Sequence, residues 1–292
     1  MFGMEDRTLS QMIIGSLPFF LRIMRENYAV SYLELDPNPT SPLYINGDNH
    51  SVYIPCCRGF GFETLVNRAH NLIQYNFFTE FLKKENPLCL VDIGSHVGLT
   101  TRQLLIFGNI QTAFIYEPYK PHFQKSLHNL KSFSNVVFNN AGLDTTNGRR
   151  DLYLDLQSSG NFSLYEEAFR RYFPKEKLIE NTTDIKVLNI FAESKKWAEN
   201  DCEFLYKSDT QGHDELLFSS IDQVFLEKIR AGCIEVWRLK QKSYDLDVFI
   251  DNLSNFNNFR FERSPKIGIT INDIRTSLSQ RNGRQDDILF WR

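Results

Sequence analysis

Carboxylate and amide side chains follow five short apolar runs of the sequence, each close to the point where the run ends. These residues are Asp92, Glu117, Asn140, Asp209 and Glu235. A charged group at the mouth of an apolar sheet costs desolvation free energy unless a ligand or water compensates for it. The pattern therefore indicates a binding or catalytic site, with carboxylates available to hold a cation, accept hydrogen bonds or remove a proton.

The elements that carry these residues follow a strand–turn–helix rhythm, which predicts an α/β fold with a mostly parallel sheet. In an open parallel sheet, ligands bind beyond the carboxyl ends of the strands, where the polar residues are expected to gather. Two further apolar runs complete a seven-stranded sheet, and we expect the last of them to be an antiparallel edge strand. The seven runs are 88–93, 113–116, 136–138, 204–206, 233–236, 259–261 and 288–290.

The turn after the first run, Val-Asp-Ile-Gly-Ser-His-Val-Gly at 91–98, favours a nucleoside with a cationic tail. Gly94 and Gly98 allow a sharp turn and a close approach of the backbone to a ligand. The turn lacks the GxGxxG spacing of a pyrophosphate site. Asp92 suits an ammonium or sulfonium group better than a phosphate, and Glu117 is placed to accept hydrogen bonds from a ribose diol. The nucleoside that combines these features is S-adenosylmethionine.

Five segments, taken together and in order, resemble the FkbM-type S-adenosylmethionine-dependent methyltransferases. They are VDIGSHVGLTT at 91–101, FIYEPYKPHFQKSLHNL at 114–130, VVFNNAGL at 136–143, FLYKSDTQGHDELL at 204–217 and DDILFW at 286–291. The pattern Lys-x-Asp-x-Gln-Gly at 207–212 is the family-specific part. The resemblance covers about 88–291 and leaves the first 80 residues without a counterpart. Asp214 departs from the family, which usually has Glu there, so a direct role for Asp214 is in doubt.

The resemblance implies a Rossmann-like class I methyltransferase fold and assigns roles to individual residues. Asp92, Gly94 and Gly98 would shape the methionine side of the pocket, and Glu117 would hold the ribose. Asn140 and Ala141 would line the adenine, and Ser95, His96, Thr101 and Pro118 would complete the cofactor site. The family is typified by O-methylation of hydroxyls on sugars, glycans and small natural products, so we expect such an acceptor.

Methyl transfer to a hydroxyl requires alignment of the reacting groups, which contributes about 7–11 kcal/mol, and removal of a proton. We predict Asp209 as the base or as the group that orients the hydroxyl, with His213 and Glu235 as its partners. His213 lies at a helix start, where a structural role is an equal alternative. These three side chains could instead hold a divalent cation, although no spacing demands a metal. We expect Lys207 to form a structural ion pair with a neighbouring carboxylate.

Two other functions stay open at this point. The same cofactor could serve methylation of an amine or a carboxylate on a small molecule, because the strand-end residues do not exclude those acceptors. The chain could also be a catalytically inactive binding subunit that keeps the fold. The three strand-end carboxylates Asp92, Glu117 and Asp209 argue against the inactive subunit.

Composition limits the class of protein and its surroundings. The chain has 292 residues, 33 Lys and Arg against 36 Asp and Glu, and a formal net charge of −3, which argues against a nucleic-acid binder. The five cysteines show no CxxC spacing, so we expect no disulfide scaffold or zinc site, and a reducing, cytoplasmic location. Cys89 and Cys233 each lie in an apolar run and are expected to be small buried hydrophobes.

The expected organisation is an N-terminal extension at 1–85 and a Rossmann-like domain at 86–292, with an insertion at about 158–200. The apolar stretch at 12–21 contains Pro18 and is too short to span a bilayer. We predict that it forms an amphipathic helix that packs on the body of the protein or on a second subunit. No stretch has the length of a transmembrane helix, so no membrane span is expected.

Overall fold

The computed structural model describes residues 32–35, 50–55, 71–83, 86–155, 160–168, 181–238, 244–262, 268–280 and 285–292. The predicted helix in the first 31 residues lies outside these ranges, and so does the proposed contact of that helix with a second subunit. Cys56 and Cys57 also lie outside them. The described residues hold the whole predicted sheet together with the helices that cover it.

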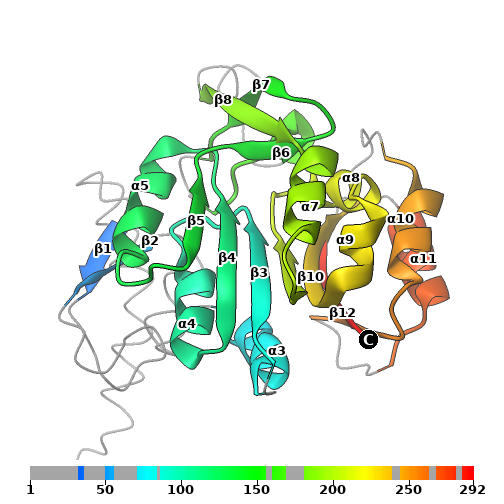
Figure 1. Ribbon diagram of the computed structural model, residues 1–292. Helices are drawn as coiled ribbons and strands as arrows, with labels where there is room; N and C mark the ends of the chain where they lie inside the picture. The colour runs from blue at the N-terminus through cyan, green and yellow to red at the C-terminus, as the bar shows by residue number, and fades with distance from the viewer. Residues whose placement is uncertain are drawn as a thin grey trace, which may run out of the picture.

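A seven-stranded sheet forms the centre of the molecule and has the order β11-β12-β10-β9-β3-β4-β5 (Figure 1). The strands are β3 (Leu88–Ile93), β4 (Ile110–Tyr116), β5 (Val136–Asn139), β9 (Glu203–Ser208), β10 (Ile229–Trp237), β11 (Asn258–Phe261) and β12 (Gln285–Trp291). Strands β3, β4, β5, β9 and β10 are parallel neighbours, whereas β12 runs antiparallel to both β10 and β11. This confirms a Rossmann-like α/β sheet in which the order reverses beside β3, at the switch point.

The antiparallel C-terminal strand is confirmed, but β12 lies one strand inside the edge. Its register pairs Ile234 of β10 with Ile288 and, on the other side, Phe261 of β11 with the same Ile288. Gly232 makes room for this strand, because a Cβ at that position would lie 2.2 Å from the ring of Phe290. The edge position therefore belongs to β11, and the more apolar β12 is covered on both sides.

Helices cover both faces of the sheet, because its strands are apolar on both faces. One face carries α3 (Leu72–Leu82) and α4 (Leu99–Phe107), whose buried side chains share a core with Leu90, Ile115 and Leu205. Helix α5 (Lys120–Asn129) contacts α4. The other face carries α7 (Ile190–Ala198), α8 (Asp214–Ser219), α9 (Gln223–Lys228), α10 (Leu246–Leu253) and α11 (Ile271–Ser279). Within the described residues, none of these helices combines the length and the hydropathy that crossing a bilayer requires.

Several of these helices begin at a side chain that caps the backbone. Asn189, Asp222 and Asp245 accept hydrogen bonds from backbone N–H groups in the first turns of α7, α9 and α10. Thr270 and Asp273 form a reciprocal capping box at the start of α11. Such caps satisfy N–H groups that have no partner inside the helix, and each contributes about 1 kcal/mol.

A three-stranded sheet with the order β6-β8-β7 lies across one end of the central sheet, at the top of Figure 1. It consists of β6 (Gly142–Asp144), β7 (Gly148–Tyr153) and β8 (Thr182–Asn189). Leu152, Ile185 and Val187 form the apolar core of this smaller sheet. Helix α7 then follows β8 directly, and its Ile190 and Trp197 are buried in the core that α7 to α11 form on one face of the central sheet.

Two short strands and one disulfide were not expected. Strands β1 (Tyr32–Leu35) and β2 (Val52–Pro55) form an antiparallel pair. The side-chain amide of Asn129 in α5 accepts a hydrogen bond from the N–H of Tyr53 and donates one to its carbonyl.

Cys89 is bonded to Cys202, which corrects its assignment as a free buried thiol, whereas Cys233 is free and buried. The pair was hidden because 113 residues separate the two cysteines, and only the pairing of β3 with β9 brings them together. The disulfide also removes the basis for expecting a reducing compartment.

Candidate active site

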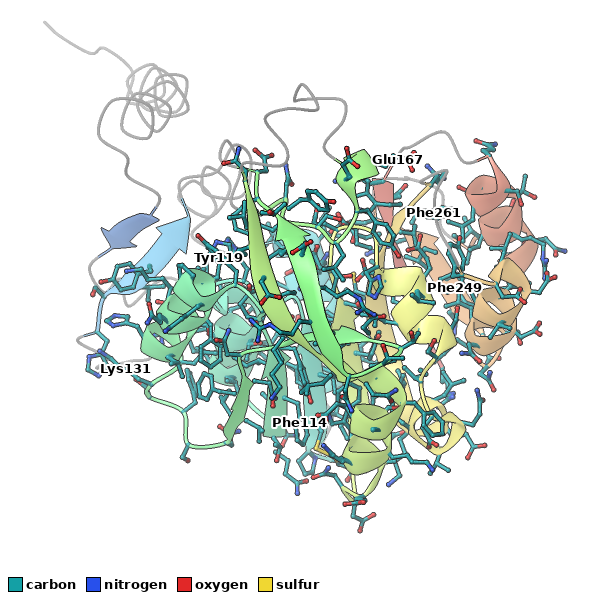
Figure 2. All side chains as sticks on the ribbon, turned by 90° about the horizontal axis from the view of Figure 1, so that it is seen from above. Phe114, Tyr119, Lys131, Glu167, Phe249 and Phe261 are labelled. Carbon is teal, nitrogen blue, oxygen red and sulfur yellow. A yellow bond between two sulfur atoms is a disulfide. The ribbon has the colours of Figure 1, made fainter. Side chains whose placement is uncertain are left out.

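A cavity lies where the carboxyl ends of β3, β4 and β9 meet the underside of the small sheet. About 930 Å³ of space lies between its walls, counting the part that is open to solvent. Figure 2 looks down on this end of the molecule, where the small sheet crosses over the central strands. Seven of the residues predicted for the site line the cavity: Gly94, Ser95, His96, Glu117, Pro118, Asp209 and His213.

The turn after β3 forms the floor of the cavity and is held in an unusual backbone conformation. Gly94 has φ +72°, and a Cβ there would lie 2.0 Å from the backbone oxygen of Asp209, so only glycine fits between β3 and β9. His96 has φ 53° although it is not glycine. The N–H groups of Gly94 and Ser95 both donate to the carbonyl of Tyr116. Such strained positions cluster at ligand sites, where the surrounding structure enforces them.

Glu117 faces this turn from the end of β4 and is 5% exposed. One carboxylate oxygen accepts a hydrogen bond of 2.9 Å from the backbone N–H of His96, and the other accepts one of 2.9 Å from the N–H of Tyr119. The Nδ1 atom of His122 lies 3.7 Å from the carboxylate. An ionised carboxylate can accept about four hydrogen bonds, so the two backbone donors leave acceptor positions for a ligand.

Asp92 does not line the cavity. It is fully buried, with one carboxylate oxygen 3.1 Å from Nζ of Lys207 and the other accepting a hydrogen bond of 2.6 Å from Thr101 Oγ1. The ion pair expected for Lys207 is therefore present, and the cause is the register that puts Asp92 opposite Lys207 on β9. Burial lowers the pKa of Lys207, but the carboxylates of Asp92 and Asp209 outweigh it and raise the pKa above its ordinary value.

Asp209 begins the loop after β9 and lines the cavity beside Lys207 and Gln211. Its carboxylate accepts a hydrogen bond of 2.7 Å from Gln211 Nε2, and the other oxygen lies 3.9 Å from Lys207 Nζ. Asp214 sits behind this loop, fully buried, and accepts hydrogen bonds from Ser208 Oγ and from the N–H groups of Thr210 and Gly212. Asp214 thus shapes the loop that presents Asp209.

His213 lines the cavity and contacts two residues that the sequence analysis did not single out. Its Nδ1 atom lies 3.0 Å from the hydroxyl of Tyr165, and its Nε2 atom lies 3.3 Å from a carboxylate oxygen of Asp144. Asp144 ends β6, and Tyr165 belongs to the described segment 160–168. The small sheet and this segment therefore both meet the turn after β9 at His213.

Glu235 is not among the residues that line the cavity. Its carboxylate accepts a hydrogen bond of 2.7 Å from Trp237 Nε1, and it pairs across the sheet with Asp287 of β12. Burial raises the pKa of Asp287 well above its ordinary value, and a hydrogen bond with Glu262 and the charge of Glu235 act in the same direction. Glu235 thus belongs to an acidic group at β10 and β12. Within the described residues no cluster of three His, Cys, Asp or Glu side chains could hold a metal ion.

Four other predicted cofactor residues also lie outside the cavity lining. Gly98 begins α4 with φ +76°, and a Cβ there would meet Leu130 at 2.9 Å, so it permits packing of α4 on α5. The hydroxyl of Thr101 donates its hydrogen bond to Asp92. Asn140 donates from its amide to the carbonyls of Glu117 and Pro118, so it braces the end of β4 from outside, and Ala141 is buried beside it.

An aromatic cluster stands instead beside Glu117. The rings of His122 and Phe162 are stacked with centroids 4.9 Å apart, and Tyr119 meets Phe162 edge-on at 5.0 Å. His122 and Phe162 both line the cavity, and Tyr119, labelled in Figure 2, packs against the small sheet. Sequence reasoning missed His122 although it follows Glu117 by only five residues. Phe162 carries no signal in the sequence, because only the folded small sheet brings it to this end.

Polar atoms without partners point to a ligand in the cavity. Ser95 Oγ, Thr210 Oγ1 and Gln211 Oε1 are buried and make no hydrogen bond with any of the described residues, and all three residues line the cavity. A buried polar atom without a partner costs about 1–3 kcal/mol. Together with the remaining acceptor positions of Glu117, these atoms offer a polar ligand several hydrogen bonds.

No protein-family model matches the sequence, and a comparison with curated proteins likewise finds no match. Among solved structures, the FkbM methyltransferase from Methylobacillus flagellatus has 12% identity and a TM-score of 0.38. The match covers 70% of this chain and 44% of that one, so this chain spans less than half of that protein's length.

Two further solved structures cover more of both chains. A SAM-dependent methyltransferase from Agrobacterium tumefaciens has 6% identity and a TM-score of 0.41, and the match covers 90% of this chain and 70% of that one. A geranyl diphosphate methyltransferase has 11% identity and a TM-score of 0.37, with 97% of each chain covered. All three of these solved structures are named as methyltransferases.

Proposed function

We propose that this protein is an S-adenosylmethionine-dependent methyltransferase that transfers a methyl group to a hydroxyl of a sugar, glycan or small natural product. The observation that carries the proposal is Glu117, a buried carboxylate at the end of β4 that faces the cavity with acceptor positions to spare. A vicinal diol satisfies such a carboxylate with two hydrogen bonds, each contributing about 1.5–3 kcal/mol. The sequence segments around the cavity agree with this assignment.

The bound cofactor would supply a methyl group that is already activated by a positively charged sulfur. The protein's share of the work is to align the acceptor and to manage its proton. Asp209 lies on the cavity wall, and its Gln211 hydrogen bond fixes the carboxylate in place. We assign Asp209 to orienting the acceptor hydroxyl or accepting its proton. The Nζ atom of Lys207, which Asp92 also contacts, lies 3.9 Å from this carboxylate.

The acceptor would enter between the turn after β9 and the small sheet. The cavity wall there combines the polar Asp209, Gln211 and His213 with the apolar side chains of Leu164 and Ile185. A wall of mixed polarity suits a ring that carries hydroxyls on its edge and C–H groups on its faces. This matches a sugar or a hydroxylated natural product better than a purely apolar acceptor.

Isothermal titration calorimetry with S-adenosylhomocysteine tests the cofactor assignment directly. We expect saturable binding with one site per chain. Absence of heat at millimolar ligand, in a sample whose unfolding transition is cooperative, would contradict the proposal and favour an inactive subunit. Transfer of a radioactive methyl group to a panel of methyl glycosides and phenolic glycosides then identifies the acceptor class.

The variant Asp209→Asn tests the role of the carboxylate in the chemistry. With a hydroxyl acceptor, the loss of a group that orients it or accepts its proton lowers turnover by a factor of about 10²–10⁴. The dissociation constant for S-adenosylhomocysteine is expected to stay within twofold of the wild type. The control is Asp184→Asn, which removes an exposed carboxylate from β8. A turnover that Asp209→Asn barely changes would instead indicate an amine or carboxylate acceptor.

A further inference from the structure

His213 is the residue of the cavity wall whose chemistry is most tightly defined by its neighbours. Its side chain is 7% exposed, and a polar group lies close to each ring nitrogen. Nδ1 lies 3.0 Å from the hydroxyl of Tyr165, and Nε2 lies 3.3 Å from the Asp144 carboxylate. The three residues come from three separate places in the chain, so the tertiary fold alone brings them together.

The charge of Asp144 decides which nitrogen of His213 carries the proton. Burial raises the pKa of Asp144, but the hydrogen bond with His213, the N–H of Thr145 and the charges of His213 and Arg150 outweigh it and lower the pKa to about 2. Asp144 is therefore ionised and only accepts hydrogen bonds. Because this negative charge lies 3.3 Å from Nε2, we expect the neutral imidazole to carry its proton on Nε2, which leaves Nδ1 as an acceptor.

The hydroxyl of Tyr165 is the hydrogen-bond partner of Nδ1 when no methyl acceptor is bound. Burial raises the pKa of Tyr165, and the charges of Glu215, Asp144 and Asp214 raise it further, so the side chain stays a phenol. A phenol beside an unprotonated nitrogen donates its hydrogen bond to that nitrogen. Nδ1 thus already receives an O–H donor, in the geometry that an acceptor hydroxyl needs for proton transfer.

We propose that His213 is the general base of the reaction, that Asp144 is the residue that positions it, and that Tyr165 occupies Nδ1 until an acceptor hydroxyl replaces it. The proposal deepens the proposed function and rests on it. As the oxygen–methyl bond forms, the methyl–sulfur bond breaks and its electron pair stays on sulfur. The hydroxyl proton moves to Nδ1, and the resulting imidazolium is balanced by Asp144.

This assignment divides the work between the two polar groups of the wall. Asp209 already accepts a hydrogen bond from Gln211, and its other oxygen lies 3.9 Å from the cation of Lys207. We assign Asp209 to orienting the hydroxyl, while His213 accepts the proton. Arg150 pairs with the other oxygen of Asp144 at 2.7 Å and so holds the carboxylate beside the imidazole.

The nitrogen resonances of the histidine rings test the proposal in the intact protein, without an acceptor. In a sample labelled with ¹⁵N-histidine, we expect His213 at neutral pH to show a protonated Nε2 and an unprotonated Nδ1. Asp144→Asn is expected to turn this single form into a mixture of the two tautomers, and Asp144→Glu to restore it. Asp151→Asn, which changes an exposed carboxylate on β7, serves as the control and should leave the spectrum unchanged.

Tyr165→Phe tests whether Nδ1 faces the cavity. Removing the hydroxyl is expected to move the Nδ1 resonance towards that of a free unprotonated nitrogen. It should also speed carbethoxylation of His213 by diethyl pyrocarbonate at least fivefold, as measured by mass spectrometry of the modified peptide. S-adenosylhomocysteine at saturation is expected to slow that reaction.

The outcomes separate this proposal from the proposed function. A protonated Nδ1 in the wild type, or no acceleration of carbethoxylation in Tyr165→Phe, would overturn the base assignment even if S-adenosylhomocysteine binds normally. Failure of the wild type to bind S-adenosylhomocysteine would overturn the proposed function and with it the reaction assigned here. The wild-type spectrum decides the tautomer even if a variant does not fold.

Discussion

Glu117 serves two purposes with one carboxylate. It accepts hydrogen bonds from the backbone of His96 and Tyr119, which ties the turn after β3 to the start of α5. It also keeps acceptor positions on the cavity side, where a diol can reach them. In the proposed function, the same side chain would both shape the cofactor site and bind the ribose.

Glu117→Gln is expected to weaken binding of S-adenosylhomocysteine about tenfold or more, because an amide loses the charge-assisted part of the hydrogen bonds. Gln has the same size but only one acceptor oxygen, so it keeps one of the two backbone hydrogen bonds, and thermal unfolding measures the cost of losing the other. Calorimetry gives the dissociation constant, and Glu80→Gln on the exposed face of α3 is the control. A dissociation constant equal to that of the wild type would show that Glu117 does not contact the ribose.

Asp92 and Lys207 form a buried ion pair whose members depend on each other. Asp92 is fully buried and Lys207 is 4% exposed, so neither charge is solvated. Removing one partner of such a pair leaves the other charge uncompensated, which costs about 3–5 kcal/mol. Asp92, near the end of β3, is thus a structural residue that supports Lys207 at the cavity wall.

Lys207→Met is expected to lower the free energy of unfolding by about 3–5 kcal/mol, measured by urea denaturation. The double variant Asp92→Asn with Lys207→Met should recover part of this loss, because no unpaired charge then remains. If the single and the double variant lose the same stability, the ion pair is not what holds these strands together.

At the scale of elements, the close approach of β3 and β9 at Gly94 sets the geometry of the floor. The N–H of Asp209 donates to the carbonyl of Ile93, and the backbone oxygen of Asp209 fills the space that a Cβ on residue 94 would need. Two loops that carry site residues are thereby held at a fixed separation. Gln211, with φ 56°, extends the second loop over the cavity.

Gly94→Ala is expected to destabilise the protein by about 1–3 kcal/mol and to weaken S-adenosylhomocysteine binding, because the two loops must separate. Gly108→Ala is a matched control, since Gly108 also has a positive φ of +108° but a Cβ there meets nothing within 4 Å. Thermal unfolding and calorimetry are measured on both. Equal effects of the two substitutions on ligand affinity would mean that backbone strain alone, and not the close approach, matters.

The small sheet and the segment 160–168 form the roof of the cavity. Ser163 donates to the carbonyl of Gln211 at 2.7 Å, and its backbone pairs with that of Tyr153 on β7. Phe162 is thereby placed on His122, close to Glu117. The roof is thus joined to both loops of the floor, and it supplies the apolar walls that the floor lacks.

At the scale of the whole molecule, the disulfide between Cys89 and Cys202 joins the starts of two adjacent central strands, at the end opposite the cavity. It closes a loop with a sequence separation of 113 residues that contains β4, β5 and the small sheet. A cross-link of this kind restricts the unfolded chain far more than the folded one. Its contribution is therefore to stability and not to the chemistry of the site.

Replacing both Cys89 and Cys202 by Ser is expected to lower the free energy of unfolding by about 2–4 kcal/mol in urea denaturation. Adding dithiothreitol should destabilise the wild type by a similar amount and leave the double variant unchanged. Cys233→Ala, at the free buried cysteine, should keep the response to reductant. A wild type that shows no response to reductant during unfolding would contradict the disulfide.

The sequence by itself determined the sheet and the place of the site. Short apolar runs such as 88–93 and 204–206, set between turns and helical stretches, predict strands buried on both faces, and residues that end parallel strands gather at one edge. The position of Glu117 and Asp209 at this edge was therefore predictable from local pattern and chain order. The antiparallel direction of β12 was predictable on the same grounds.

Only the tertiary structure decided which of the gathered groups face the cavity. A shift of one residue along a strand moves a side chain to the opposite face of the sheet, and the sequence of a strand does not specify its register with a distant partner. The register of β3 with β9 places Asp92 beside Lys207, and the register of β10 with β12 places Glu235 beside Asp287. Contacts across long separations, such as Cys89 with Cys202 or Asp144 and Tyr165 with His213, depend on how the small sheet folds over the central one.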